Sequence, residues 1–248
     1  MRLEGRIAVI TGGNSGIGLA IARAFRLEGA KIAILGRDPD TLAAAVDELG
    51  SGTLAVRGDI SVPEDLDRLF SEVDSAFGQI DILVANAAIY SSVPLEQTTP
   101  EFFDAMNDAN FRGTFFTVQR SLPYLADDAS VILVTSTANT AGIPGLSVYA
   151  ATKAAVRSLA RSFAAELQPR GIRVNAISPG MTDTPIFERL GMSRPEVDAM
   201  QESMSEQIPM GRFGRPDEIA AVALFLASDA SSYVTGVELP VSGGLGQL

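Results

Sequence analysis

Short apolar runs, many of them rich in β-branched residues, recur at intervals along the chain. They lie at residues 7–10, 32–35, 54–56, 82–85, 131–134, 172–177 and 237–241. Each run is continuous rather than alternating, which is typical of strands buried on both faces of a parallel sheet. We therefore expect these seven runs to form buried strands.

Segments between the runs have the period of amphipathic helices. One apolar helical face consists of Ile17, Ile21, Ala24 and Phe25, and another of Leu66, Leu69, Phe70, Val73 and Phe77. Ser61 and Glu64 form a capping-box pattern before the second of these helices, with Pro63 near its first turn. The pattern predicts a helix that begins just after Ser61.

A further helix is expected from Pro39 to the stop at Gly50, capped by Asp38 or Asp40. The alternation of strands and helices predicts βαβ units with right-handed crossovers. The expected fold is therefore α/β. It is a single Rossmann-type, doubly wound domain over residues 1–248, with a seven-stranded, mostly parallel sheet and helices on both faces.

Residues 181–210 interrupt the alternation. They contain no strand pattern and only a weak helical one, and they hold five of the seven methionines. A long irregular segment in a compact domain is usually functional, often a lid, and methionine side chains adapt to irregular apolar shapes. A substrate lid and an ordinary helical excursion both fit this pattern.

Composition narrows the possible functions. The formal net charge of −11 disfavours nucleic acid and anionic membrane surfaces as partners, and no apolar run is long enough to span a bilayer. We expect a soluble cytoplasmic protein. The chain has no Cys and no His, which excludes thiol nucleophiles, Ser-His-Asp triads and the usual zinc sites, and we assign no metal site. Proton chemistry is left to Tyr, carboxylates or the only two lysines, Lys31 and Lys153.

A glycine-rich turn follows the first predicted strand. Such a turn brings backbone N–H groups and a helix N-terminus close to a pyrophosphate, although glycines alone are also compatible with a simple tight turn. Its place after the first strand favours a dinucleotide site. The residues expected to bind the cofactor there are Gly12, Asn14, Ser15, Gly16, Ile17 and Gly18.

Gly36-Arg37-Asp38 ends the second strand, where the type of cofactor is selected. A carboxylate at this point binds the ribose hydroxyl of NAD, whereas an Arg accommodates the 2′-phosphate of NADP. Arg37 therefore favours NADP(H), unless it is an ordinary surface charge. Asp38 would repel the phosphate unless it points away as a helix cap.

Two further strand ends carry polar residues that complete the expected cofactor site. Asp59 and Ile60 follow the third strand, where the carboxylate of Asp59 can accept a hydrogen bond from adenine. Asn86 and Ala87 follow the fourth strand beside the same cleft. Either polar residue could also be a turn former.

The candidate catalytic groups follow the fifth strand. Ser136 comes directly after it, and Tyr149 and Lys153 lie four residues apart, on one face of a helix. A free phenol has a pKa of about 10, and a neighbouring ammonium lowers it, so that the pair can exchange a proton with a substrate oxygen. A surface aromatic–cation pair is the simpler alternative.

The chain resembles the short-chain dehydrogenase/reductase family over essentially its whole length. The family motifs are matched by Thr11, Gly12, Gly16, Gly18, Asn110, Ser136, Tyr149, Lys153, Pro179, Gly180 and Thr184. The resemblance implies that Asn110 holds Lys153 through water, that Tyr149 and Lys153 also bind the cofactor, with Lys153 holding its ribose, and that Pro179, Gly180 and Thr184 lie against the cofactor. Two motifs depart from the family: Ala88 replaces a glycine, and Ser242 replaces an aspartate.

The resemblance implies an NADP(H)-dependent oxidoreductase that interconverts ketones and secondary alcohols. Within the family, the chain most resembles bacterial NADPH-dependent carbonyl reductases that accept bulky ketones, and an apolar or bulky substrate is expected. In this interpretation Ile186, Phe187, Leu190 and the methionines of residues 181–210 form the lid, and the protein is a homotetramer.

Two alternatives stay open. A 3-oxoacyl-[acyl-carrier-protein] reductase would need a basic docking patch, for which Arg112, Arg120, Arg157 and Arg161 are candidates. The other is a nucleotide-binding regulator without turnover, which the intact set of catalytic residues disfavours.

Overall fold

The computed structural model describes residues 1–186 and 191–248. Its centre is one seven-stranded sheet in the order β3-β2-β1-β4-β5-β6-β7, and every pairing between neighbours is parallel. The strands are β1 (Ile7–Thr11), β2 (Lys31–Gly36), β3 (Leu54–Arg57), β4 (Ile80–Ala85), β5 (Leu125–Val134), β6 (Arg173–Pro179) and β7 (Glu238–Val241). The predicted fold class is confirmed.

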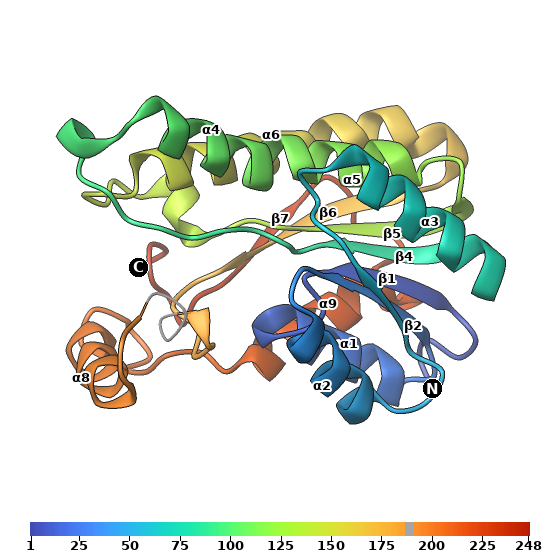
Figure 1. The fold of residues 1–248 in the computed structure, drawn as a ribbon, viewed down its shortest axis with the longest axis horizontal. Coiled ribbons are helices and arrows are strands. Elements are labelled where there is room, and N and C mark those ends of the chain that lie inside the picture. Colours follow the sequence, from blue (N-terminus) through green and yellow to red (C-terminus); the bar gives the residue numbers. More distant parts are fainter. Residues whose placement is uncertain (187–190) are drawn as a thin grey trace.

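Helices cover both faces of the sheet (Figure 1). One face carries α1 (Gly16–Leu27), α2 (Pro39–Leu49) and α9 (Pro216–Ala227). The other carries α3 (Pro63–Phe77), α5 (Gly113–Ser121) and α6 (Ser147–Leu167), with α4 (Pro100–Asn107) beside α6. Among the described residues, no helix has the length and apolar character needed to cross a membrane.

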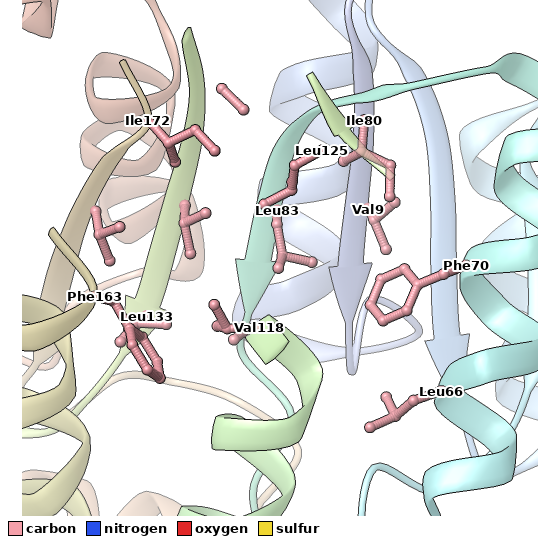
Figure 2. Packing of buried hydrophobic residues seen from close by; sticks show 14 of the residues in the cluster. Val9, Leu66, Phe70, Ile80, Leu83, Val118, Leu125, Leu133, Phe163 and Ile172 are labelled. Atoms are coloured by element: carbon pink, nitrogen blue, oxygen red, sulfur yellow. The ribbon is translucent and has the colours of Figure 1, made fainter. Parts of the chain in front are cut away.

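The continuous apolar strands divide their side chains between two cores. In β1, Val9 packs into the core under α3, α5 and α6, while Ile10 packs into the core on the opposite face. Figure 2 shows Phe70 of α3 over Val9 and Phe163 of α6 beside Leu133. Strand side chains alternate between the faces, so a strand that is covered twice must be apolar at every position.

One expected strand start and one expected helix cap were wrong. β5 begins at Leu125 rather than at residue 131, because exposed polar residues interrupt its apolar run. The N-cap of α3 is Val62, and no side chain caps this helix. Ser61 instead donates hydrogen bonds to Asp59 Oδ1 from its hydroxyl (2.8 Å) and its backbone N–H (2.9 Å), so the expected capping box does not form.

The segment 181–210 contains a regular helix that the weak pattern understated. α8 (Arg194–Ser205) begins with a capping box in which Ser193 pairs with Glu196, and it lies apart from the sheet in Figure 1. Gln201, a residue of α8, donates a hydrogen bond from its side-chain Nε2 to Asp183 Oδ1 at 2.8 Å. Phe187 and Leu190, two of the expected lid residues, lie outside the described residues.

Candidate active site

A cavity of about 680 Å³ lies at the carboxyl ends of the strands. It spans the point where the strand order reverses between β1 and β4, which is where open parallel sheets bind ligands. Its volume is within the usual range of small-molecule sites, about 300–1,000 Å³. All the site residues predicted from the sequence line this cavity except Asn110.

The glycine-rich turn between β1 and α1 forms one end of the cavity. Gly12 has φ +65°, and a Cβ at Gly18 would collide with the carbonyl oxygen of Gly12. Thr11 Oγ1 accepts hydrogen bonds from the N–H groups of Asn86 and Ala87, both at 3.1 Å, and so fastens the turn to the end of β4. The turn therefore approaches its ligand with backbone atoms.

The N-terminus of α1 opens into the same cavity. Within the described part of the chain, its N-cap Ser15 makes no capping hydrogen bond from its side chain. The first N–H groups of α1 are thus available to an anion, where the helix dipole also favours negative charge. This end of the cavity fits the pyrophosphate of a dinucleotide.

Asp38 and Arg37, at the end of β2, have different tasks. Asp38 caps α2: its Oδ1 accepts from the Thr41 N–H at 2.8 Å and the Thr41 hydroxyl at 2.9 Å. Asn14 Nδ2 also donates to the Thr41 hydroxyl, at 2.7 Å. Of the two cap candidates, the structure therefore selects Asp38. The Asp38 carboxylate, which would repel the phosphate of NADP, is therefore held at the start of α2 by Thr41. Thr41 also lines the cavity, and the sequence did not single it out.

Arg37 extends along the rim of the cavity, with 66% of its side chain exposed. Its NH1 lies 3.4 Å from Asp59 Oδ2, a weak contact in a solvated position. Burial raises the pKa of Asp59, but hydrogen bonds from Ser61 and the Arg37 charge outweigh burial, and the pKa is lowered overall. Asp59 is therefore ionised, and its carboxylate is held by Ser61 in the wall of the cavity.

Ser136, Tyr149 and Lys153 all line the cavity. Ser136 caps the short helix η3 (Thr137–Thr140) directly after β5, and its Oγ accepts from the Ala138 N–H at 3.2 Å. Tyr149 and Lys153 lie on the first two turns of α6. Lys153 is buried, and its Nζ donates to the Val134 carbonyl at 2.9 Å and lies 5.9 Å from the centre of the Tyr149 ring.

Burial dominates the electrostatics of this pair. It raises the pKa of Tyr149 to about 12, an effect that the hydrogen bond with Ser136 opposes and the nearby Tyr90 phenol reinforces. Burial also lowers the pKa of Lys153 to about 8. The expectation that Lys153 lowers the Tyr149 pKa was wrong: the pKa is raised, and the only opposing effect is the hydrogen bond with Ser136. Tyr149 is therefore protonated at neutral pH, the state that a proton donor requires.

Asn110 lies behind the cavity rather than in its wall. It is fully buried in the π-helical turn η2 (Asp108–Arg112), and its side chain forms two hydrogen bonds with the backbone of Ile89. Its Oδ1 accepts from the Ile89 N–H at 2.8 Å, and its Nδ2 donates to the Ile89 carbonyl at 2.9 Å. The water-mediated link to Lys153 stays a prediction. Asn110 does fix Ile89, which lines the cavity.

The two departures from the family motifs lie close to the cavity. Ala88 is part of its lining. Ser242 packs against Gly180, where a Cβ would lie 2.8 Å from the Ser242 Cα, and its hydroxyl donates to the Leu245 carbonyl at 3.1 Å. Ser242 thereby helps to hold Leu245 in the cavity wall.

The sequence did not identify most of the apolar wall around the catalytic groups. The Tyr90 ring packs edge-on against Tyr149, with ring centres 5.1 Å apart and an interplanar angle of 83°. The other apolar residues of this wall are Ile89, Ile143, Leu146, Met181, Ile186 and Leu245. Met181 and Ile186 belong to the expected lid segment, whereas Ile89, Ile143, Leu146 and Leu245 come from distant segments without a shared spacing, so no motif reveals them.

Comparisons with known proteins agree with this geometry. A protein-family model described as enoyl-(acyl carrier protein) reductase matches residues 12–246. The oxidoreductase asL5 of Sarocladium schorii is 44% identical over 100% of this chain and 98% of its own length. The 3-oxoacyl-(acyl-carrier-protein) reductase FabG of Thermotoga maritima is 38% identical over 99% of both chains.

Two further matches bear on the cofactor and the fold. The NADP-dependent (R)-specific alcohol dehydrogenase of Lentilactobacillus kefiri is 36% identical over 98% of this chain and 97% of its own length. A crystal structure from Brucella melitensis, described as short-chain dehydrogenase/reductase SDR:glucose/ribitol dehydrogenase, superimposes with a TM-score of 0.92. It is 34% identical and covers 98% of both chains.

Proposed function

Because the chain belongs to the short-chain dehydrogenase/reductase family, and is an oxidoreductase of that family, we propose that it interconverts a ketone and a secondary alcohol with NADP(H). One observation carries this proposal. A single cavity contains the glycine-rich turn, Arg37, and a half-buried Tyr149 that is hydrogen-bonded to Ser136.

The preference for NADP(H) over NAD(H) is supported by the end of β2. Arg37 offers a guanidinium suited to a phosphate, and the carboxylate of Asp38 is occupied by Thr41 at the start of α2. The relative from Lentilactobacillus kefiri is named as NADP-dependent. An apolar or bulky substrate is supported by the aliphatic and aromatic wall beside Tyr149.

The residues divide the reduction between them. The nicotinamide cofactor supplies hydride to the carbonyl carbon when it is bound. Ser136 and Tyr149 hydrogen-bond the carbonyl oxygen, where negative charge develops. Tyr149 Oη then gives its proton to that oxygen, which yields the alcohol. Lys153 places a positive charge under the Tyr149 ring and stabilises the tyrosinate that remains. In alcohol oxidation the tyrosinate acts as the base.

A panel of ketones of increasing size, run separately with NADPH and NADH, tests this function. We expect oxidation of NADPH with bulky aryl ketones and much slower turnover with NADH. A protein that binds NADPH but turns over no ketone in the panel would support the regulator instead.

A second candidate is reduction of 3-oxoacyl groups on acyl carrier protein, favoured by the similarity to FabG. The basic patch that it would need is largely committed to internal contacts. Arg120 pairs with Asp67 at 3.2 Å, Arg157 pairs with Glu238 at 3.0 Å, and Arg112 donates to the Ser61 carbonyl at 3.2 Å. Competition between a free aryl ketone and a carrier-bound substrate separates the two functions.

The proposal also includes one catalytic domain over residues 1–248, a cytoplasmic homotetramer, and a substrate lid at residues 181–210. Met181 and Ile186 in the cavity wall support the lid. The assembly follows from membership of a family whose enzymes are commonly oligomeric, and light scattering coupled to size-exclusion chromatography tests it.

A further inference from the structure

We propose that Glu238 is a positioning residue that sets the place of Ser136 relative to Tyr149 and Lys153. This inference rests on the proposed function, because it assigns Glu238 a part in the same reaction. Glu238 is the first residue of β7, at the edge of the sheet, and only 12% of its side chain is exposed. It does not line the cavity and so acts through other residues.

One carboxylate oxygen of Glu238 holds the chain on both sides of Ser136. Its Oε1 accepts from the Thr135 hydroxyl at 2.6 Å, one residue before Ser136. It also accepts from Asn139 Nδ2 at 2.6 Å, three residues after Ser136. Both bonds are short and partly buried, and hydrogen bonds to a carboxylate are stronger than those between neutral groups. The turn that carries Ser136 is thus clamped at both ends by one group.

The two donor residues, Thr135 and Asn139, depend on Glu238 in different ways. Thr135 is buried, and its backbone N–H donates to the Ile177 carbonyl at 2.8 Å, so it ties the end of β5 to β6 through its backbone and to β7 through its hydroxyl. Asn139 Oδ1 is buried and has no hydrogen-bond partner within the described part of the chain. The bond from Nδ2 to Glu238 is therefore what orients the Asn139 side chain.

The other carboxylate oxygen reaches the helix that carries the remaining catalytic groups. Glu238 Oε2 lies 3.0 Å from Arg157 Nε. Tyr149, Lys153 and Arg157 are spaced four residues apart along α6, so they follow one side of the helix. Glu238 therefore links the Ser136 turn and the Tyr149 helix, whose separation the reaction requires to be fixed.

The consequence of losing this link follows from how the reaction depends on geometry. A misplacement of about 1 Å can lower a rate about a hundredfold. The side chain of Glu238 contacts Thr135, Asn139 and Arg157, none of which is an expected cofactor-binding residue. Loss of Glu238 should therefore lower kcat and leave cofactor affinity intact.

The test compares Glu238→Ala and Glu238→Gln with Asp81→Ala in the full chain. Asp81 is a matched control, because its carboxylate accepts from the Ile7 N–H at 2.8 Å and pairs with Arg6 at 2.9 Å, at the opposite end of the strands. For each protein we measure kcat and KM with the best ketone of the panel, the Kd of NADPH by fluorescence, and the thermal midpoint.

Glu238→Ala should lower kcat by about tenfold or more while the Kd of NADPH changes by less than about twofold. Glu238→Gln keeps one acceptor oxygen and should recover part of that loss. Asp81→Ala should lower the thermal midpoint by a similar amount and leave kcat unchanged. Equal kcat values in Glu238→Ala and the wild type, or an equal loss in Asp81→Ala, would overturn the inference.

A pH profile of alcohol oxidation provides a readout that general destabilisation would not move. Tyr149 is faced by Ser136, by the Tyr90 phenol and by the Lys153 ammonium. Only the Ser136 hydrogen bond, which lowers the Tyr149 pKa, should weaken in Glu238→Ala, so the rising limb of the profile, along which Tyr149 loses its proton, should move to higher pH. An unmoved limb counts against the inference.

Two safeguards keep the result interpretable. If Glu238→Ala does not fold, the kcat of Glu238→Gln relative to Asp81→Asn decides the matter in the same way. If the wild type itself reduces no ketone, the proposed function has failed. If the wild type is active and the Glu238 variants match it, only the positioning role has failed.

Discussion

The two halves of the cavity are built by different means. The nucleotide half uses backbone: a glycine turn, the N-terminus of α1, and side chains such as Thr11 that hold the backbone in place. The catalytic half uses side chains whose ionisation is shifted by burial, namely Tyr149 and Lys153, inside an apolar wall. One half is thus prepared to bind charge and the other to move a proton, so substitutions should separate binding from turnover.

The largest separation is expected for Tyr149→Phe. Removal of the hydroxyl takes away the proton donor but keeps the ring that packs against Tyr90, so kcat should fall by about a thousandfold or more. The Kd of NADPH should hardly change. The fully exposed Tyr233 supplies the control, and Tyr233→Phe should retain wild-type kcat. Substantial turnover by Tyr149→Phe would show that another group donates the proton.

The sequence predicted the central residues of both halves, but for different reasons. The glycines and Arg37 could be located because a βα turn and a strand end need particular residue types at fixed positions. Tyr149 and Lys153 were located because few other groups can move a proton in a chain without His or Cys, and Ser136 was located through the family motif. The strands were predicted for the same kind of reason, since burial on both faces requires an unbroken apolar run.

What the sequence missed depends on tertiary contacts. Ser61 matches a capping box, but the Asp59 carboxylate competes for its hydroxyl and N–H, and only the folded loop brings those groups together. Tyr90 and Leu245 meet at the cavity from segments far apart in the chain. The burial that raises the Tyr149 pKa is likewise a property of the assembled site, not of the spacing between Tyr149 and Lys153.

Arg37→Ala should produce the reverse of the Tyr149 result. Hydrogen bonds to charged groups contribute about 1.5–3 kcal/mol, so the KM for NADPH should rise by about tenfold or more. The KM for NADH, which lacks the phosphate, should change little, and kcat with saturating NADPH should be retained. Arg26→Ala removes another partly exposed guanidinium, which contacts the Ser51 carbonyl, and should alter neither constant. Equal effects on both cofactors would mean that Arg37 does not bind the phosphate.

Lys153→Met tests whether the buried ammonium of Lys153 lowers the free energy of unfolding. Burial lowers the Lys153 pKa from 10.5 to about 8, so below pH 8 the folded chain carries the full cost of a buried ammonium. The inactive Met variant should therefore be more stable than the wild type at pH 7 without cofactor, by about 1–3 kcal/mol at about 1.4 kcal/mol per pKa unit.

The sign of the pH dependence provides the check on that variant. Between the folded pKa of about 8 and the unfolded value of 10.5, the unfolded wild type binds more protons than the folded one. Wild-type stability should rise with pH in this window relative to Lys153→Met, and the advantage of the variant should shrink. Urea unfolding at a series of pH values measures it. A variant that is less stable than the wild type at pH 7, with no trend above pH 8, would mean that burial of the Lys153 ammonium does not lower folding stability.

The smallest effect is expected for Asp38→Ala, which tests the nucleotide half. Because the carboxylate caps α2 through Thr41, its loss should cost about 0.5–2 kcal/mol of folding stability. If that cap is its only task, the ratio of KM values for NADPH and NADH should stay within about twofold of the wild type. Asp38→Asn keeps a capping side chain without the charge and should restore most of the stability. A clear gain in NADPH affinity in both variants would instead show that the Asp38 charge reaches the phosphate, and that the cap does not shield the site from it.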